Sequence, residues 1–227
     1  MLYFINPKRN SMNKRTISSR LAGYRAMIHG AVGISSIKKK LRQYGYTDEV
    51  LAEGQELLAD TENLFTEQAN EYTESYEAQE AFENIRSEVE DEFHTLYHVT
   101  KIALRKHTSM NSVLPPSSDT VPYKNWIATT EKFYNSLAGS STALNIVAKR
   151  GISAEQVQNA ITRLNHMETV RLKRDVENGQ AQTKTGERNE KLEELHLYCA
   201  DLRDIAKVAF KDAPQNLEQL GLIIRSN

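Results

Sequence analysis

The 227-residue chain contains a single cysteine, Cys199, and no apolar run of the roughly 18 residues that a membrane-spanning helix requires. One cysteine excludes an intrachain disulfide and is typical of proteins from a reducing compartment. The apolar residues 1–5 form too short a run for the core of a signal peptide, and basic residues follow this run instead of preceding it. The sequence therefore predicts a cytoplasmic protein without a membrane span.

Glycine and proline are also scarce through the first half of the chain. Glycine is absent between Gly54 and Gly139, and proline is absent between Pro7 and Pro115. Because these two residues interrupt helices most strongly, helix is possible almost throughout residues 47–107. No stretch of any length shows the apolar–polar alternation of a β-strand. The sequence predicts an all-α fold.

Two neighbouring segments carry charges of opposite sign, and each is nearly free of the other sign. Residues 1–44 contain ten Lys or Arg and no acid, whereas residues 45–95 contain sixteen Asp or Glu and one base, Arg86. We expect these segments to lie side by side and to neutralise each other. The alternative is a basic surface for nucleic acid, made of Lys38, Lys39, Lys40 and Arg42. An acidic helix packed nearby would repel phosphate, so nucleic acid is a possible partner but not the favoured one.

The chain contains an internal sequence repeat. The stretch VTKIALRK at 99–106 is matched by IAKVAFKD at 205–212, an offset of 106 positions (205 − 99 = 106). The same offset relates Gly45 to Gly151 without a gap. An ungapped internal repeat at a constant offset predicts a duplicated helical unit. We therefore predict an elongated up-and-down helical bundle built from two diverged copies of a three-helix unit.

The predicted boundaries follow from composition and spacing. Residues 1–16 are predicted to be a disordered basic segment, and the proline-rich residues 115–122 to be a linker. Repeat 1 then covers 17–114 and repeat 2 covers 123–227, with both repeats packed into one bundle. In each repeat a broken first helix is expected, with its second part capped by a serine or threonine and closed by glycine. The candidate caps are Ser35 or Ser36 and Ser141 or Thr142, and the closing glycines are Gly45 and Gly151.

Two structures fit the long segments 47–107 and 153–212. Apolar residues recur in heptads through both, but the pattern turns polar near the middle of each segment. One possibility is a single helix of about sixty residues, which the unbroken heptad phase favours. The other is a helical hairpin with its tip at 73–80 and 177–188, where each of Gly179 and Gly186 weakens helix by about 1 kcal/mol. We prefer the hairpin, because short antiparallel helices bury more of their apolar stripe.

Two patterns resemble metal-ligand spacing. Ferritin-like bundles hold two irons with a carboxylate three residues before a histidine on each of two helices, and with one carboxylate from each of two other helices. The residues concerned are Asp91, His94, Glu193, His196, Glu62 and Glu168. The two motifs do not follow the repeat offset, and an inward Phe93 leaves His94 facing outward. A second possibility is a surface site made by His94 and His98. We assign no catalytic, cofactor-binding or metal residue, expect no cofactor, and interpret Cys199 as a small core residue.

The end of the chain carries a more specific pattern. Residues 205–210, IAKVAF, run into residues 212–222, DAPQNLEQLGL. This ending resembles the ends of a group of bacterial helical proteins without an assigned activity, in which an A-x-V-A-F helix runs into a Pro-Gln, Leu-Glu, Leu-Gly ending. The match covers roughly 145–225, and repeat 1 only faintly, because residues 107–114 lack Pro-Gln. The resemblance implies a helical bacterial protein and carries over no functional residue.

The favoured function is that of a non-enzymatic interaction or structural protein that acts through its helix faces, with a protein partner or as a homo-oligomer. The candidate surface residues are Tyr72, Tyr76, Phe82 and Tyr97. The alternatives are a nucleic-acid-binding protein that uses the basic first helix, and a metal-dependent enzyme of ferritin-like type. No motif singles out an enzymatic reaction.

Overall fold

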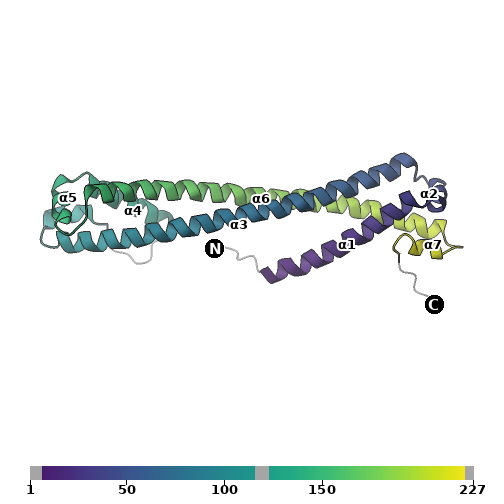
Figure 1. Cartoon of the computed structure of the whole chain (residues 1–227), viewed down its shortest axis with the longest axis horizontal. Coiled ribbons are helices and arrows are strands. Elements are labelled where there is room, and N and C mark those ends of the chain that lie inside the picture. Colours follow the sequence, from purple (N-terminus) through teal and green to yellow (C-terminus); the bar gives the residue numbers. More distant parts are fainter. Residues whose placement is uncertain (1–6, 116–122, 223–227) are drawn as a thin grey trace. The chain divides into compact units, whose positions relative to one another are not determined.

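The computed structural model describes residues 7–115 and 123–222, and within these ranges the chain is helical without β-strands (Figure 1). The prediction of an all-α up-and-down bundle is confirmed. The elements in chain order are α1 (Pro7–Gly33), α2 (Ser35–Arg42), α3 (Asp48–Leu104), the 3-10 helix η1 (Thr108–Val113), α4 (Tyr123–Ala138), α5 (Ser141–Ala148), α6 (Ala154–Ala209) and α7 (Gln215–Glu218).

The chain divides into two compact units that differ from the predicted repeats. Unit 1 combines residues 1–70 with 182–227, and unit 2 contains residues 71–181. The long helices α3 and α6 are shared between the units, so that each unit takes the first part of one long helix and the last part of the other. Within each unit these two helix segments run antiparallel.

Unit 1 packs α1 and α2 against the beginning of α3 and the end of α6. Its buried side chains come from all four helices and from the segment around α7, and they include Ile28, Ile37, Leu51, Leu202 and Leu220. Polar contacts join the two long helices where the apolar seam weakens. The Gln68 side-chain amide donates a hydrogen bond to the Thr185 hydroxyl at 3.1 Å, and Lys184 pairs with Glu67 at 3.0 Å.

Unit 2 packs α4 and α5 against the end of α3 and the beginning of α6. Its core contains Phe93, Phe133, Tyr134, Val157 and Met167. The hydroxyl of Ser75 on α3 donates a hydrogen bond to the Asn178 side-chain oxygen on α6 at 2.6 Å. The same two helices are therefore joined by apolar contacts and by polar ones within this unit.

The predicted hairpins are wrong, because α3 and α6 are single helices of 57 and 56 residues. The polar centre does not form a tip; its side chains find partners on the other long helix, as the pairs of Gln68 with Thr185 and of Ser75 with Asn178 show. Gly179 and Gly186 lie within α6, with open space beside both. Their cost of about 1 kcal/mol each is tolerated because the flanking helix is held by packing.

The chain breaks where glycine predicted it to break, but the caps differ in detail. Gly45 and Gly151 adopt positive φ angles of 93° and 88°, as expected for glycines that close a helix. The N-cap of α5 is Ser140, whose hydroxyl accepts the Ala143 amide, and not Ser141 or Thr142. For α2 the N-cap is Ile34, which has no side-chain acceptor, so neither Ser35 nor Ser36 serves as the cap.

The two ends of the chain differ in how well the sequence predicted them. Helix α1 begins at Pro7, ten residues before the predicted start at residue 17, and therefore covers 7–16 of the segment expected to be unstructured. A proline suits the first helical position, because its missing amide would lack a partner there anyway. Residues 1–6 and linker residues 116–122 lie outside the described residues. At the other end, α7 follows Pro214 and is closed by Gly221 with φ 73°, as predicted.

Candidate functional sites

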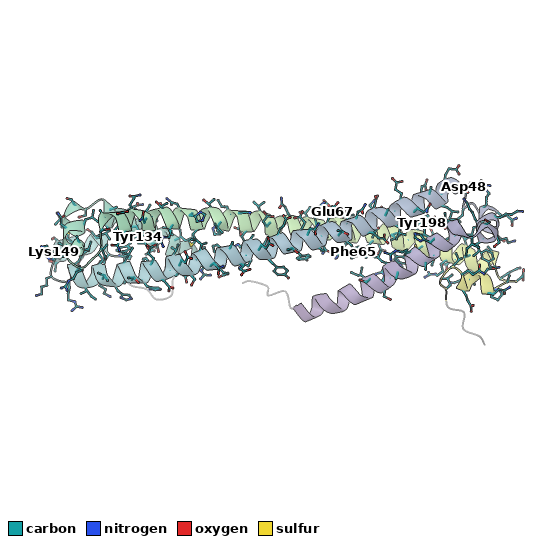
Figure 2. The ribbon with its side chains drawn as sticks, in the orientation of Figure 1. Asp48, Phe65, Glu67, Tyr134, Lys149 and Tyr198 are labelled. Atoms are coloured by element: carbon teal, nitrogen blue, oxygen red, sulfur yellow. The ribbon has the colours of Figure 1, made fainter. Side chains whose placement is uncertain are left out.

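The predicted basic surface on α2 is partly neutralised by the start of α3. Asp48, which Figure 2 labels at the start of α3, forms ion pairs with Lys38 at 2.9 Å and with Arg42 at 3.2 Å. The hydrogen bond from Lys38 lowers the pKa of the Asp48 carboxyl below its usual value. Lys40 lies over the Tyr44 ring, and Lys39 is exposed and makes no ion pair within the described part of the chain. Two of the four predicted phosphate contacts are therefore already used.

Further along unit 1, α1 and α3 show the expected neutralisation directly. Arg25 on α1 pairs with Glu62 on α3 at 2.7 Å. Both side chains are substantially exposed, so the pair contributes little to stability. It does show that the basic and acidic segments lie side by side here.

The ferritin-like residue set is not assembled into one carboxylate and histidine cluster. Glu62 is paired with Arg25, and Glu168 with Arg171 at 3.2 Å. The His196 Nδ1 atom shares a hydrogen bond of 2.6 Å with the Tyr24 hydroxyl. Each of these groups has a local partner that satisfies it.

The second histidine pattern lies on the surface of unit 2. His94 and His98 are both exposed on α3, and their rings stack with centroids 6.3 Å apart. His94 also contacts the ring of Phe93, at 5.7 Å between centroids. This arrangement offers two imidazoles one turn apart, without a third ligand gathered beside them in the residues that the structure describes.

Cys199 is a core residue, as predicted. Its side chain is 1% exposed in the apolar core of unit 1. Burial raises the pKa of the Cys199 thiol to about 12, so the thiol stays protonated at neutral pH. Because the thiolate is the nucleophile, this cysteine is inert in the folded unit.

The predicted aromatic surface is only partly exposed. Tyr76 is 70% exposed and stacks on the half-buried Tyr72, with ring centroids 6.4 Å apart. Tyr97 is half-buried against Phe93. The prediction for Phe82 is wrong, because its ring is 2% exposed beneath the guanidinium of Arg174, 4.1 Å away. Phe82 lies instead among the buried apolar residues of unit 2.

A group of three carboxylates was missed by the sequence interpretation. Oxygens of Glu71, Glu74 and Glu177 lie within 4.8 Å of one another in unit 2. Glu71 and Glu177 each have one buried oxygen without a hydrogen-bond partner. The signal was present in the numbering, since Glu71 and Glu177 are separated by the repeat offset. Carboxylate oxygens are ligands for Ca²⁺ and Mg²⁺, although these ions require six or more oxygens.

We expect Glu177→Gln to raise the free energy of unfolding by about 0.5–1 kcal/mol, because it removes repulsion among three clustered negative charges. Thermal denaturation at low salt should show an increase of about 2–4 °C per kcal/mol. High salt should shrink the gain by screening the repulsion. The control is Glu80→Gln, an exposed carboxylate outside the trio, which should change nothing. A lower melting temperature for Glu177→Gln would show that the trio is not repulsive.

Unit 2 also contains a cavity of about 500 Å³ at the end of α3. Its wall combines cationic and apolar side chains with one amide, and the lining residues are His98, Lys101, Ile102, Leu104, Arg105, Asn111 and Leu114. Lys101 and Arg105 lie one turn apart and make no ion pair within the described residues. Lys101 contacts the Tyr97 ring, 5.6 Å from its centroid. No carboxylate lines this cavity.

None of the described helices is both long and apolar enough to cross a membrane. No protein-family model, curated protein or solved structure matches the chain. The resemblance of the chain's ending to bacterial helical proteins therefore stays a prediction.

Proposed function

We propose that the protein is a non-enzymatic structural protein that self-associates through the outer face of α6. The observation that carries this proposal is an uncharged row on a helix that is otherwise rich in charge. The row, all of whose residues are exposed and spaced by three and four positions, consists of Thr162, Asn165, Thr169, Leu172, Val176 and Gly179. We call it the outer row.

The outer row is more apolar than its composition suggests. Leu172 and Val176 are each 57% exposed. The Thr162 and Thr169 hydroxyls donate hydrogen bonds to backbone carbonyls of their own helix, at 3.0 and 3.1 Å. These donors are therefore satisfied, so that both threonines can present their methyl groups to a partner at little desolvation cost.

The spacing matches a heptad seam in which Thr162, Thr169 and Val176 occupy the a positions and Leu172 occupies a d position. β-Branched residues at a with leucine at d favour parallel two-stranded coiled coils. A second copy of α6 is therefore a suitable occupant. Asn165 and Gly179 at the remaining d positions make the seam weak. We expect reversible association.

The charges beside the outer row support a second copy and set its direction. His166 and Lys173 lie on one side of the row, and Glu168 and Asp175 lie on the other. In a parallel pair, opposite sides of the two helices face each other, and Lys173 meets Glu168 of the other copy, which Arg171 of its own helix also contacts at 3.2 Å. An antiparallel pair would place like charges together. Lys173 has no ion pair within the described residues, so it is available for such a contact.

Native mass spectrometry over a concentration series tests the proposal. We expect the 25.8 kDa chain to reach a dimer mass, and the double variant Leu172→Glu, Val176→Glu to remain at the monomer mass, because four carboxylates would be buried together. The matched control is Leu197→Glu, which alters an equally exposed leucine outside the row, 58% exposed, and should leave the dimer intact. A wild-type chain that stays monomeric throughout would overturn the proposal.

Charge exchange tests the direction of pairing. Lys173→Glu should weaken the dimer by placing two acidic sides together, and adding Glu168→Lys should restore it. A double variant no stronger than Lys173→Glu alone would argue against the parallel arrangement.

We also infer that the two halves of the chain are diverged copies. Helices α2 and α5 span Ser35–Arg42 and Ser141–Ala148, and every position of one corresponds to a position of the other at the offset of 106. Burial follows the same offset: Leu58 and Leu164 are both buried, as are Leu96 and Leu202. Equal spacing and equal burial support a common three-helix ancestor for both halves.

A further inference from the structure

We propose that the cavity at the end of α3 binds a phosphate monoester that carries a small apolar group. This site is independent of the outer row, because none of its lining residues belongs to α6. The cavity volume of about 500 Å³ falls within the range of roughly 300–1,000 Å³ typical of small-molecule sites.

The charge of the lining fits this ligand class. Lys101 and Arg105 supply two positive charges, and a phosphate monoester carries about −1.5 to −2 near neutral pH. The Arg105 guanidinium offers a fork of donors that matches phosphate oxygens. Asn111 can donate a further hydrogen bond through its amide. A carboxylate ligand would leave one of the two fixed cations without a counter-charge.

The apolar part of the lining fits the remainder of the ligand. Leu114, on the chain that follows η1, is only partly buried and can contact a ligand, whereas Leu104 is completely buried and supports the wall from within. Ile102 is 52% exposed although it is strongly apolar. An alkyl or aromatic substituent that covers Ile102 would remove this apolar surface from water.

The corresponding end of α6 provides an internal comparison. There Lys207 and Lys211 occupy the positions that correspond to Lys101 and Arg105. Cations near the C-terminal ends of α3 and α6 interact favourably with the helix dipoles. In unit 1, however, Asp204 replaces His98 and accepts an ion pair from Lys207 at 2.9 Å. Lys207 therefore has an acidic partner on its own helix, whereas the residue at the corresponding position beside Lys101 is His98.

The segments that follow α6 and α3 also differ in the burial of one leucine. After α6, Leu220 is fully buried in the core of unit 1. Its counterpart after α3 is Leu114, which is only partly buried and lines the cavity. The leucine after α6 is therefore part of the core, whereas the leucine after α3 borders the cavity beside Lys101 and Arg105.

Binding of 1-naphthyl phosphate, followed by calorimetry on the full chain, tests the inference. We expect binding that weakens with salt, and binding of the neutral analogue 1-naphthol at least about tenfold weaker. His98→Asp, which reproduces the α6 arrangement on an exposed position, should weaken binding of the phosphate by roughly tenfold or more. Arg105→Gln should do the same.

The matched control is the double variant Lys207→Gln, Lys211→Gln, which removes equivalent cations from the other helix end and should bind like the wild type. Circular dichroism should show that His98→Asp keeps its helix content. Absence of binding by the wild type, or equal binding by His98→Asp, would overturn the proposal.

A second arm identifies the source of the phosphate monoester. Phosphatidylcholine vesicles with and without phosphatidate present the same headgroup on a lipid surface. Co-sedimentation with the phosphatidate vesicles that is lost in His98→Asp would assign a lipid headgroup. Binding of 1-naphthyl phosphate without co-sedimentation would assign a soluble phosphate ester.

Discussion

Phe93→Ala is expected to lower the free energy of unfolding by about 3–5 kcal/mol, because a large buried ring would be replaced by a cavity. Phe93 is 8% exposed, and its ring contacts those of Tyr97, Trp126 and Phe133, with centroid distances of 5.7, 5.9 and 5.8 Å. These contacts join α3 to α4, so the loss should be felt throughout the core of unit 2.

Chemical denaturation followed by the fluorescence of Trp126, the single tryptophan, measures this effect where it arises. The matched control is Tyr134→Phe in the same cluster. The Tyr134 hydroxyl is buried without a hydrogen-bond partner, so its removal should be neutral or stabilising by up to about 1 kcal/mol. A loss of less than about 1 kcal/mol for Phe93→Ala would show that the ring cluster does not hold α3 to α4.

Gly54→Ala and Gly179→Ala are expected to have opposite effects on stability. Both glycines lie inside long helices, where alanine is favoured by about 1 kcal/mol. At Gly179 a methyl group meets open space, so the full gain is expected. At Gly54 the methyl group would overlap the ring of Tyr198. We expect a net loss of about 1–3 kcal/mol there, as in other overpacked sites.

The ring cannot move aside cheaply because two contacts hold it. The Tyr198 hydroxyl donates a hydrogen bond to the Val50 carbonyl at 3.0 Å, and the ring meets Tyr46 edge-on. Thermal denaturation of the two variants gives the comparison directly. In a Tyr198→Leu background, Gly54→Ala should cease to destabilise, since the overlapping ring is gone. Equal stabilisation by both alanines would contradict this packing.

Local features of the fold could be predicted from the sequence because local chemistry determines them. Gly45 and Gly151 occupy backbone conformations with positive φ that side chains resist, so their positions marked the helix ends reliably. The Ser153 hydroxyl accepts a hydrogen bond from the backbone amide of Gln156 at 3.1 Å, which is the usual role of a serine just before a helix. The interpretation of Cys199 as a small core residue is likewise confirmed.

Whether the long segments folded back on themselves could not be predicted in this way. A hairpin and a single helix use the same apolar stripe, and they differ only in what the polar centre meets. The decisive contacts, such as that of Ser75 with Asn178, join residues about a hundred positions apart. Helix propensity at Gly179 favoured the wrong answer because it carries no information about such partners.

For the candidate sites too, some features follow from the sequence and others only from the tertiary structure. The sequence by itself determined the all-α class, the glycines that close helices and the two charge blocks, because each depends on residues close together in the chain. Only the tertiary structure decided that Asp48 neutralises Lys38, that Glu71, Glu74 and Glu177 gather, and that Lys101 and Arg105 border an open cavity. Those outcomes depend on which side chains from distant parts of the sequence lie beside each charged group, and tertiary packing determines this.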